Sequence, residues 1–273
     1  MSMLDEALRA EPPPRHLLQF YEADDYALIA NVCAYAVRGI NRGEGIVLGV
    51  TAAHWRAISD FLRGTGVNVS GLVEDGVLVH LDANATLDRI LVGGYPDEAK
   101  FDSVVGSVMR QALQAGKGAR AFGELVNVLW GRGQYPAAIR LEQLWHRLLN
   151  KLPFALFCAY NIDLFDTSFD TGMLDALLRA HSHLLPSGSG NELMEALTTA
   201  LTETQGENKA RRIMLNAGDF SRRGWPSLPR TEALILWLRK NMPIEAPEIL
   251  SRAKSYYRAN ASFQPAYRAE SAT

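Results

Sequence analysis

Short apolar runs alternate with longer segments of helical periodicity from His16 to Tyr160, and this alternation restricts the fold more than any other feature. The run at residues 45–51 (GIVLGVT) is apolar throughout, as expected for a strand buried on both faces. Strands that alternate with helices of ten or more residues predict an α/β layered fold with a mostly parallel central sheet flanked by helices. The expected strands are residues 16–21, 45–51, 77–81, 119–123 and 154–160, and the main helices are residues 25–39, 52–63, 101–115 and a segment that begins near residue 139.

Two segments rich in proline, glycine or serine mark boundaries along the chain. Pro12, Pro13 and Pro14 form a stiff spacer before the first strand, and residues 187–190 (SGSG) form the clearest later boundary. The expected parts are a flexible N-terminal arm over residues 1–15, an α/β domain over residues 16–186 and a small all-helical region over residues 187–273.

The C-terminal third shows helical signals without strands. A helix from about residue 172 is expected to end near Pro186, and strand signals stop beyond Gly206. Residues 232–240 are apolar nearly all round, which predicts a buried helix, and residues 246–257 predict one more helix.

Composition indicates a globular protein, with 48% hydrophobic and 21% charged residues. No apolar run approaches the roughly 20 residues of a membrane-spanning helix, and the N-terminus lacks the apolar stretch of a signal peptide, so we expect a cytoplasmic location and no membrane partner. Cys33 and Cys158 lie in apolar surroundings, which predicts reduced, buried thiols. Two cysteines are too few for an all-cysteine zinc site.

The charge is distributed unevenly along the chain. Residues 205–273 carry 12 Lys and Arg against 6 Asp and Glu, whereas residues 1–204 carry 16 against 24. One hypothesis is therefore a DNA-binding regulator that uses the arginine pairs 211–212 and 222–223. These arginines are scattered among residues of core character, so we favour a solvated basic surface and do not expect nucleic acid as a partner.

The phosphate-binding loops common in α/β folds are missing from the sequence. The turn after the first strand, residues 22–25 (EADD), has no glycine or lysine, and its three carboxylates would repel a phosphate. The glycine-rich segments do not match G-x-G-x-x-G, which disfavours ordinary nucleotide hydrolysis. There is no G-x-S-x-G motif, and Cys158 has no adjacent base, so it is interpreted as a core residue.

Two carboxylates lie beside glycine at strand boundaries. Glu44 enters the second strand and Glu124 leaves the fourth, and ligands of open α/β sheets collect at the carboxyl ends of strands. Glu124 is the better candidate, either as a structural ion pair or as a ligand anchor. An alternative function is a nucleotide-binding or weak ATPase-like enzyme in which Glu124 acts as general base.

His181 and His183 are the one pair of histidines close enough in sequence to suggest a metal site. Side chains at i and i+2 diverge on a helix and converge only on an extended segment. A helix C-terminus, where imidazoles meet the last carbonyl groups, is therefore favoured, and no metal is expected. Trp130 and Tyr160 are candidate walls of a site, although large aromatic side chains at such spacing usually fill the core.

Several motifs, taken in order, resemble one family. They are His16 with Phe20 and Tyr21, residues 38–51 (RGINRGEGIVLGVT), 123–130 (GELVNVLW), 141–145 (LEQLW), 157–160 (FCAY) and 179–186 (RAHSHLLP). This set resembles the MEDS domain, the methanogen/methylotroph sensory domain named for the dichloromethane-dehalogenase regulator. The resemblance implies a RecA-like fold, related to the KaiC ATPases, in which the phosphate-binding loop has degenerated.

The resemblance also implies a sensory role, since such domains bind small molecules, including hydrocarbon derivatives, and precede kinase, anti-sigma or DNA-binding modules. We therefore expect a non-enzymatic sensor that binds a small molecule or a partner protein in an α/β cleft. Its helical tail would signal through self-association or contact with a regulatory protein. No cofactor can be named. The candidate ligand-binding residues implied by the motifs are His16, Tyr21, Glu44, Glu124, Trp130, Glu142 and Tyr160.

Overall fold

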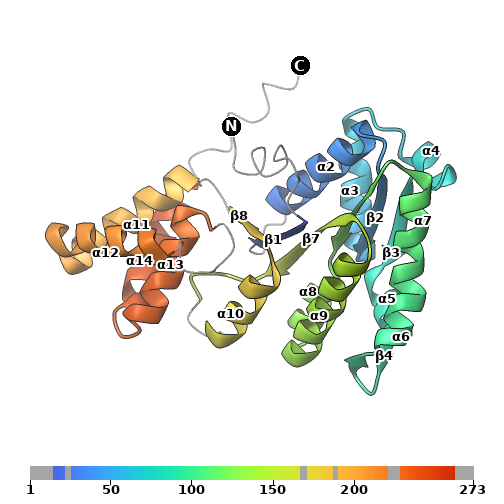
Figure 1. The fold of residues 1–273 in the computed structure, drawn as a ribbon. Helices are drawn as coiled ribbons and strands as arrows, with labels where there is room; N and C mark the ends of the chain where they lie inside the picture. The colour runs from blue at the N-terminus through green and yellow to red at the C-terminus, as the bar shows by residue number, and fades with distance from the viewer. Residues whose placement is uncertain (1–14, 22–25, 167–170, 187–189, 221–227, 262–273) are drawn as a thin grey trace. The chain divides into compact units, whose positions relative to one another are not determined.

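The computed structural model describes residues 15–21, 26–166, 171–186, 190–220 and 228–261 (Figure 1). The chain divides into two compact units: residues 1–162 with 172–185 form the first, and residues 163–171 with 186–273 form the second. The expected N-terminal arm, apart from Arg15, lies outside the described residues. Within the described ranges, no helix combines the length and apolar character needed to cross a membrane.

The first unit is built on a six-stranded sheet in the order β3-β2-β6-β7-β1-β8. All neighbouring strands in it are parallel, which confirms the predicted α/β class. The strands are β1 (His16–Tyr21), β2 (Gly45–Val50), β3 (Leu78–Asp82), β6 (Ala119–Gly123), β7 (Phe154–Asn161) and β8 (His183–Leu185), and a separate two-stranded hairpin consists of β4 (Leu91–Val92) and β5 (Tyr95–Pro96).

Strand β8 corrects one prediction. The helix expected to continue to Pro186 ends at Ala180, and His183–Leu185 pairs with β1 at the edge of the sheet. Three residues are too few to show the alternation of a strand, and Leu184 and Leu185 extend the apolar pattern of the preceding helix.

Helices cover both faces of the sheet (Figure 1). On one face, α2, α3 and α4 pack against a core that includes Ile46, Leu48 and Phe157. On the other face, α7 contacts β2 and β6, and α8 and α9 contact β7. The helices are α2 (Tyr26–Asn41), α3 (Ala52–Gly64), α4 (Val69–Glu74), α5 (Ala83–Ile90), α6 (Glu98–Phe101), α7 (Ser107–Ala115), α8 (Leu125–Gly131), α9 (Tyr135–Lys151) and α10 (Thr171–Ala180), and a π-helical turn, η1 (Asp102–Gly106), joins α6 to α7.

The second unit contains four helices among its described residues: α11 (Gly190–Gln205), α12 (Glu207–Phe220), α13 (Arg230–Asn241) and α14 (Ala246–Ala261). Helix α13 is buried on nearly all sides, as its apolar sequence predicts. Its Arg239 side chain donates to the carbonyl oxygen of Leu164 at 2.6 Å, within the same unit. Helix α12 was not predicted from the sequence.

Candidate functional site

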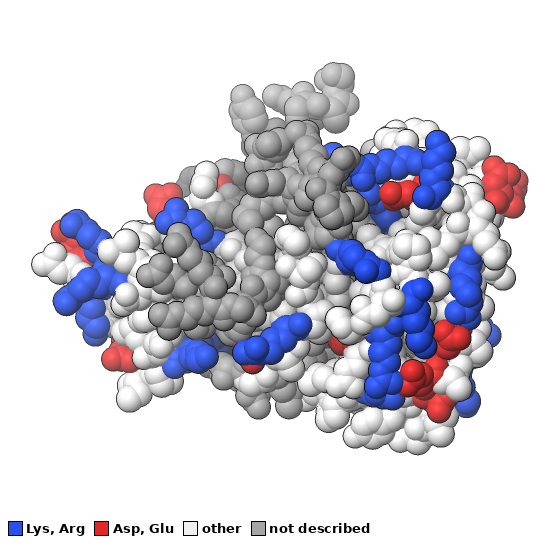
Figure 2. Space-filling model, in the orientation of Figure 1, with Lys and Arg blue, Asp and Glu red and all other residues white. Residues whose placement is uncertain are grey.

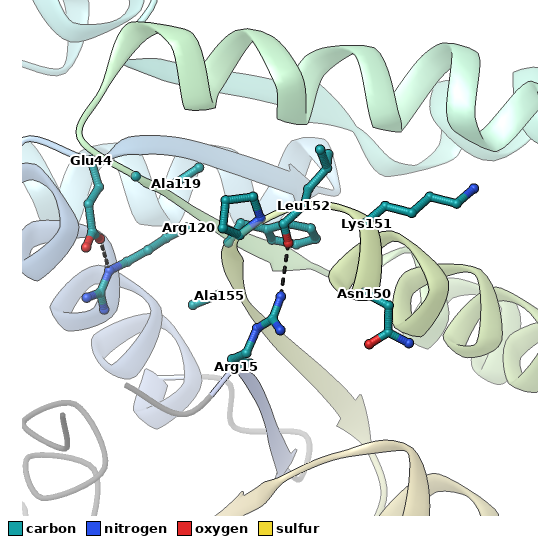
Figure 3. A pocket seen from close by; sticks show the side chains of 11 residues that line it. Arg15, Glu44, Ala119, Arg120, Asn150, Lys151, Leu152 and Ala155 are labelled. Carbon is teal, nitrogen blue, oxygen red and sulfur yellow. Dashed lines mark hydrogen bonds and ion pairs between the residues drawn. The ribbon is translucent and has the colours of Figure 1, made fainter. Parts of the chain in front are cut away.

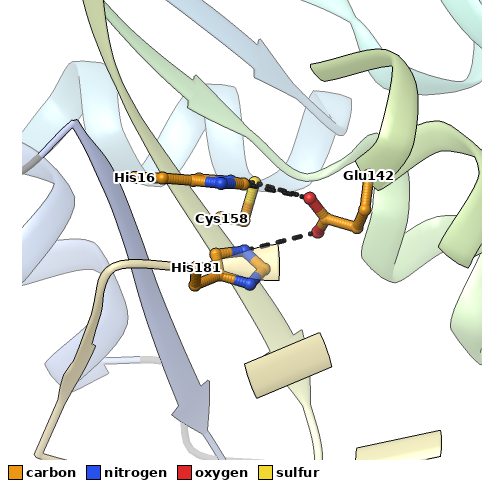
Figure 4. Close-up of side chains that lie close together, drawn as sticks. All are labelled: His16, Glu142, Cys158 and His181. Atoms are coloured by element: carbon orange, nitrogen blue, oxygen red, sulfur yellow. Dashed lines mark hydrogen bonds and ion pairs between the residues drawn. The ribbon is translucent and has the colours of Figure 1, made fainter. Parts of the chain in front are cut away.

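Four buried polar side chains meet on the α9 face of the sheet (Figure 4). His16 belongs to β1, Cys158 to the neighbouring strand β7, Glu142 to α9, and His181 follows the last residue of α10. In the parallel register, Leu18 is opposite Cys158, so His16 lies one pleat away on the same face. Glu142 is on the buried face of α9, among leucines and Trp145. These residues form the "buried cluster".

Backbone contacts fix the orientation of both imidazoles. The Nδ1 atom of His16 lies 2.8 Å from the Ala180 carbonyl oxygen, and Nδ1 of His181 lies 2.6 Å from the Leu177 carbonyl oxygen. A carbonyl oxygen only accepts hydrogen bonds, so each Nδ1 carries the hydrogen. Each Nε2 atom therefore presents its lone pair to the cluster, where both lie 3.5 Å from a carboxylate oxygen of Glu142.

The remaining contacts join Cys158 and Tyr160 to this carboxylate. Tyr160 donates its hydroxyl hydrogen to Glu142 Oε1 at 2.6 Å, and Cys158 Sγ lies 3.9 Å from Glu142 Oε2. Cys158 Sγ also lies 3.5 Å from His16 Nε2. Burial raises the pKa of the Cys158 thiol and of the Tyr160 hydroxyl, and Glu142 raises both further. Burial, together with the His181 ring, lowers the pKa of His16 well below its ordinary value. At neutral pH, the cluster therefore contains a protonated thiol and an uncharged His16 ring.

A groove between α9 and α10 leads to the buried cluster. It has a volume of about 400 Å³ and lies wholly within the first unit. Glu142 lines this groove and also belongs to the cluster, so this residue is common to the two. The residues of this "α9–α10 groove" are Ile139, Glu142, Gln143, His146 and Arg147 from α9, and Ala176, Leu177, Arg179 and Ala180 from α10.

Of two more predicted site residues, Trp130 packs against Tyr160, whereas Tyr21 contacts Asn127. The Trp130 ring contacts the Tyr160 ring edge to face, with 5.4 Å between ring centroids. The Tyr21 hydroxyl accepts a hydrogen bond of 2.9 Å from the side-chain Nδ2 of Asn127. The side-chain Oδ1 of Asn127 accepts a hydrogen bond from the backbone N–H of Asn161. His16, Glu142 and Tyr160 are thus brought together, with Trp130 packed beside them and Tyr21 bonded separately to Asn127.

Glu44 lies elsewhere, at the amino ends of the strands. Its carboxylate forms an ion pair with the buried Arg120 guanidinium, which also lies over the Tyr35 ring. Figure 3 shows this pair on one side of a pocket of about 450 Å³, with Arg15 and Leu152 nearby. Arg15 donates to the Leu152 carbonyl oxygen at 3.0 Å.

Glu124 occupies the predicted position at the carboxyl end of β6, and its side chain connects that end to α3. It accepts hydrogen bonds from the Thr51 backbone amide at 3.0 Å and from the Thr51 hydroxyl at 3.3 Å. Its other oxygen lies 2.8 Å from His54 Nδ1. Glu124 is 3% exposed, and its contacts with Thr51 and His54 are those expected from the first of the two interpretations left open by the sequence, a structural ion pair.

Sequence reasoning left out two members of the cluster. Cys158 was interpreted as core, and it is buried and unpaired with Cys33, as predicted for both thiols. His181 does bond to a helical carbonyl group, as expected of a helix C-terminus, whereas His183 belongs to β8. Cys158 and Tyr160 are two residues apart on a strand, and this spacing is the signal that places both on one face.

The fold and the site define a parallel α/β domain with a buried polar cluster on one face of its sheet. Residues 15–182 match the family model described as MEDS, the methanogen/methylotroph, DcmR sensory domain. This match covers more than half of the chain, so the chain belongs to this family of sensory domains, and the resemblance seen in its motifs is confirmed. The relation to the KaiC ATPases stays a prediction. No curated protein and no solved structure matched the chain.

Proposed function

We propose that the first unit is a non-enzymatic sensor that binds a small, largely apolar molecule in the α9–α10 groove. The observation that supports this function is that Glu142, which lines the groove, also belongs to the buried cluster. Its volume of about 400 Å³ is within the range of small-molecule sites. Ile139, Ala176 and Leu177 supply apolar surface, and Glu142 supplies a polar group that could orient a ligand.

The state of the thiol supports binding without chemical conversion. The thiolate is the nucleophilic form of cysteine, and burial keeps Cys158 protonated by raising its pKa. Glu142 raises that pKa further, which is opposite to what a catalytic cysteine requires.

The chain path suggests how binding would be signalled. The chain leaves the first unit after Ile162, contributes residues 163–171 to the second, returns for residues 172–185 and then continues in the second. The segment 172–185, which contains most of helix α10 and so one wall of the groove, is therefore joined at both ends to segments of the second unit. A ligand that moves α10 would act on the second unit through the chain itself, and the second unit would pass the change to a regulatory protein or to another copy.

No observation favours the two alternative functions over this one. An ATPase-like enzyme would need Glu124 available as a general base, but its carboxylate is bonded to Thr51 and His54. For DNA binding, Arg211 is paired with Glu207, and the arginine pair 222–223 lies outside the described residues. On the face drawn in Figure 2, the described basic side chains form separate groups, several of them beside acidic ones.

Thermal-shift measurements on the full chain would test the proposal with a panel of short hydrocarbons, halogenated hydrocarbons and alcohols. A ligand at 100 times its Kd stabilises a protein by about 2.7 kcal/mol. We expect at least one compound to raise the melting temperature of the wild type and of the control Ala57→Trp, which changes an exposed residue of α3. Ala176→Trp, which fills the groove, should remove the shift. Absence of any shift in the wild type, or a full shift in Ala176→Trp, would contradict the proposal.

A further inference from the structure

We propose that His16, Glu142, Cys158 and His181 form a binding site for a divalent transition-metal ion, with Zn²⁺ as the ion that fits best. Each residue offers one ligand atom, and these atoms all lie within 4.8 Å of one another. The sequence predicted no metal, because it was searched for cysteine sets and for histidines close together along the chain, such as His181 and His183, and these four residues are distant in sequence. The inference goes beyond ligand binding in the groove and does not rest on it.

Several separations between donor atoms are close to those around a four-coordinate ion, and all four donors lie within 4.8 Å of one another. Zn²⁺ binds nitrogen and oxygen at about 2.0–2.2 Å and sulfur at about 2.3 Å, so neighbouring donors in a tetrahedron are about 3.3–3.7 Å apart. Glu142 Oε2 lies 3.5 Å from His16 Nε2, and the other carboxylate oxygen, Oε1, lies 3.5 Å from His181 Nε2. Cys158 Sγ lies 3.5 Å from His16 Nε2 and 3.9 Å from Glu142 Oε2. Small side-chain adjustments would complete the shell.

The histidines are already oriented as ligands. Each donates its Nδ1 hydrogen to a backbone carbonyl oxygen, which leaves the Nε2 lone pair available, as in most metal-binding histidines. Nε2 of His181 is buried and has no hydrogen-bond partner among the described residues. A buried polar atom without a partner is costly, and a metal ion would satisfy it.

A hydrogen bond from a residue outside the cluster also orients the Glu142 carboxylate. The Tyr160 hydroxyl donates to Oε1 at 2.6 Å and fixes the rotation of the carboxylate. An outer hydrogen bond of this kind commonly orients a ligating carboxylate. Tyr160 is thus a positioning residue, and the Trp130 ring packs against it.

The charge of the donor set also suits a divalent ion. When Zn²⁺ binds, the Cys158 S–H bond breaks, a Zn–S bond forms and the thiol proton leaves to water. The Glu142 carboxylate and the Cys158 thiolate then offset the two positive charges, and both imidazoles remain uncharged. A neutral centre is the form that a buried site tolerates. Thiolate and imidazole ligands favour Zn²⁺ over Mg²⁺ or Ca²⁺.

Cobalt titration of the full-length chain, after treatment with a chelator and a reductant, would test the site directly. Co²⁺ substitutes for Zn²⁺ and gives a thiolate charge-transfer band and the visible bands of a tetrahedral ion. We expect one Co²⁺ per chain, displaced by one equivalent of Zn²⁺. Failure of the wild type to bind either ion would overturn the proposal, whatever the variants do.

Variants then locate the ion. Cys158→Ser should lose the charge-transfer band, whereas Cys33→Ser, which changes the other buried cysteine, should keep it. His181→Gln and Glu142→Gln should each weaken Zn²⁺ binding by about tenfold or more, by analogy with the effect of outer-shell changes. Circular dichroism would establish that each variant is folded. If the band survived in a folded Cys158→Ser protein, or if it disappeared in a folded Cys33→Ser protein, the assignment would be wrong.

Discussion

Two buried tyrosines of the first unit provide a matched test of the buried cluster. Tyr160 is 0% exposed and Tyr35 is 2% exposed, so a Tyr→Phe change removes a buried oxygen at either position. The Tyr160 hydroxyl donates to Glu142 at 2.6 Å. The Tyr35 hydroxyl has no hydrogen-bond partner among the described residues. The two variants differ mainly in this one hydrogen bond.

The expected changes in the free energy of unfolding have opposite directions. A hydrogen bond to a charged group contributes about 1.5–3 kcal/mol. Tyr160→Phe removes the hydroxyl donor from Glu142 Oε1, so this variant should lower the free energy of unfolding by about 2 kcal/mol. Tyr35→Phe removes a hydroxyl that is buried without a partner, and should be neutral or stabilise by up to about 1 kcal/mol. The Arg120 guanidinium, 4.9 Å from the Tyr35 ring centroid, keeps its contact with a phenylalanine ring.

Equilibrium urea unfolding of the full chain would measure both changes. A chelator must be present, because an ion that binds only the folded state would add its own stabilisation. The chain has two units, so each unfolding transition is fitted separately. The reasoning would be refuted if Tyr35→Phe lost as much stability as Tyr160→Phe, because burial alone would then explain both changes.

Two further predictions concern the sheet and its helices. A Cβ atom at Gly45 would overlap the Ala112 backbone carbonyl group. At Gly49 it would approach the end of the Leu125 side chain at 2.8 Å and lie at ordinary contact distance, 3.6 Å, from the Phe122 carbonyl oxygen. In urea unfolding, Gly45→Ala should therefore cost about 3 kcal/mol and Gly49→Ala less than about 1 kcal/mol; equal costs would contradict this difference. Burial lowers the pKa of His80, against the opposing effects of the Val50 backbone and Asp82, and its ring is stacked on Trp55. The unfolded chain then binds the proton more tightly, so the contribution of His80 to stability is complete above about pH 6.5 and is lost as the pH falls toward its folded pKa. His80→Gln should reduce the loss of stability between pH 7 and pH 5, and an unchanged pH slope would contradict the prediction.

The sequence was sufficient to predict most of the α/β unit, because each of its longer strands is also a distinct apolar run in the sequence. The five predicted strands are all present, and the apolar run at β2 is buried along its whole length. The exceptions are short or atypical elements. Strand β8 has three residues, and the start of the helix predicted at residues 101–115 is a π-helical turn that periodicity does not distinguish from an α-helix.

The candidate site was harder to predict because it is assembled from distant segments. His16, Glu142 and Tyr160 were identified through family motifs, but no local pattern shows that they meet. Glu124 was placed correctly at a strand end, yet its partners Thr51 and His54 follow a different strand. Residue types and spacing identify candidate site residues. Which side chains contact a given carboxylate, and so whether it has a structural or a functional role, depends on the order of the strands in the sheet.

The buried cluster attaches the returning segment, residues 172–185, to the sheet. The His16 carbonyl oxygen accepts hydrogen bonds of 2.8 Å from both the backbone amide and the hydroxyl of Ser182, and the His16 ring bonds to Ala180. The same segment forms one wall of the α9–α10 groove and supplies His181. A metal ion gained by the cluster, or a molecule bound beside Glu142, would therefore act on a segment whose two ends continue into the second unit. Under the proposed function, occupancy of such a site would be transmitted without a reaction, because the segment that completes the site is joined at both ends to the second unit.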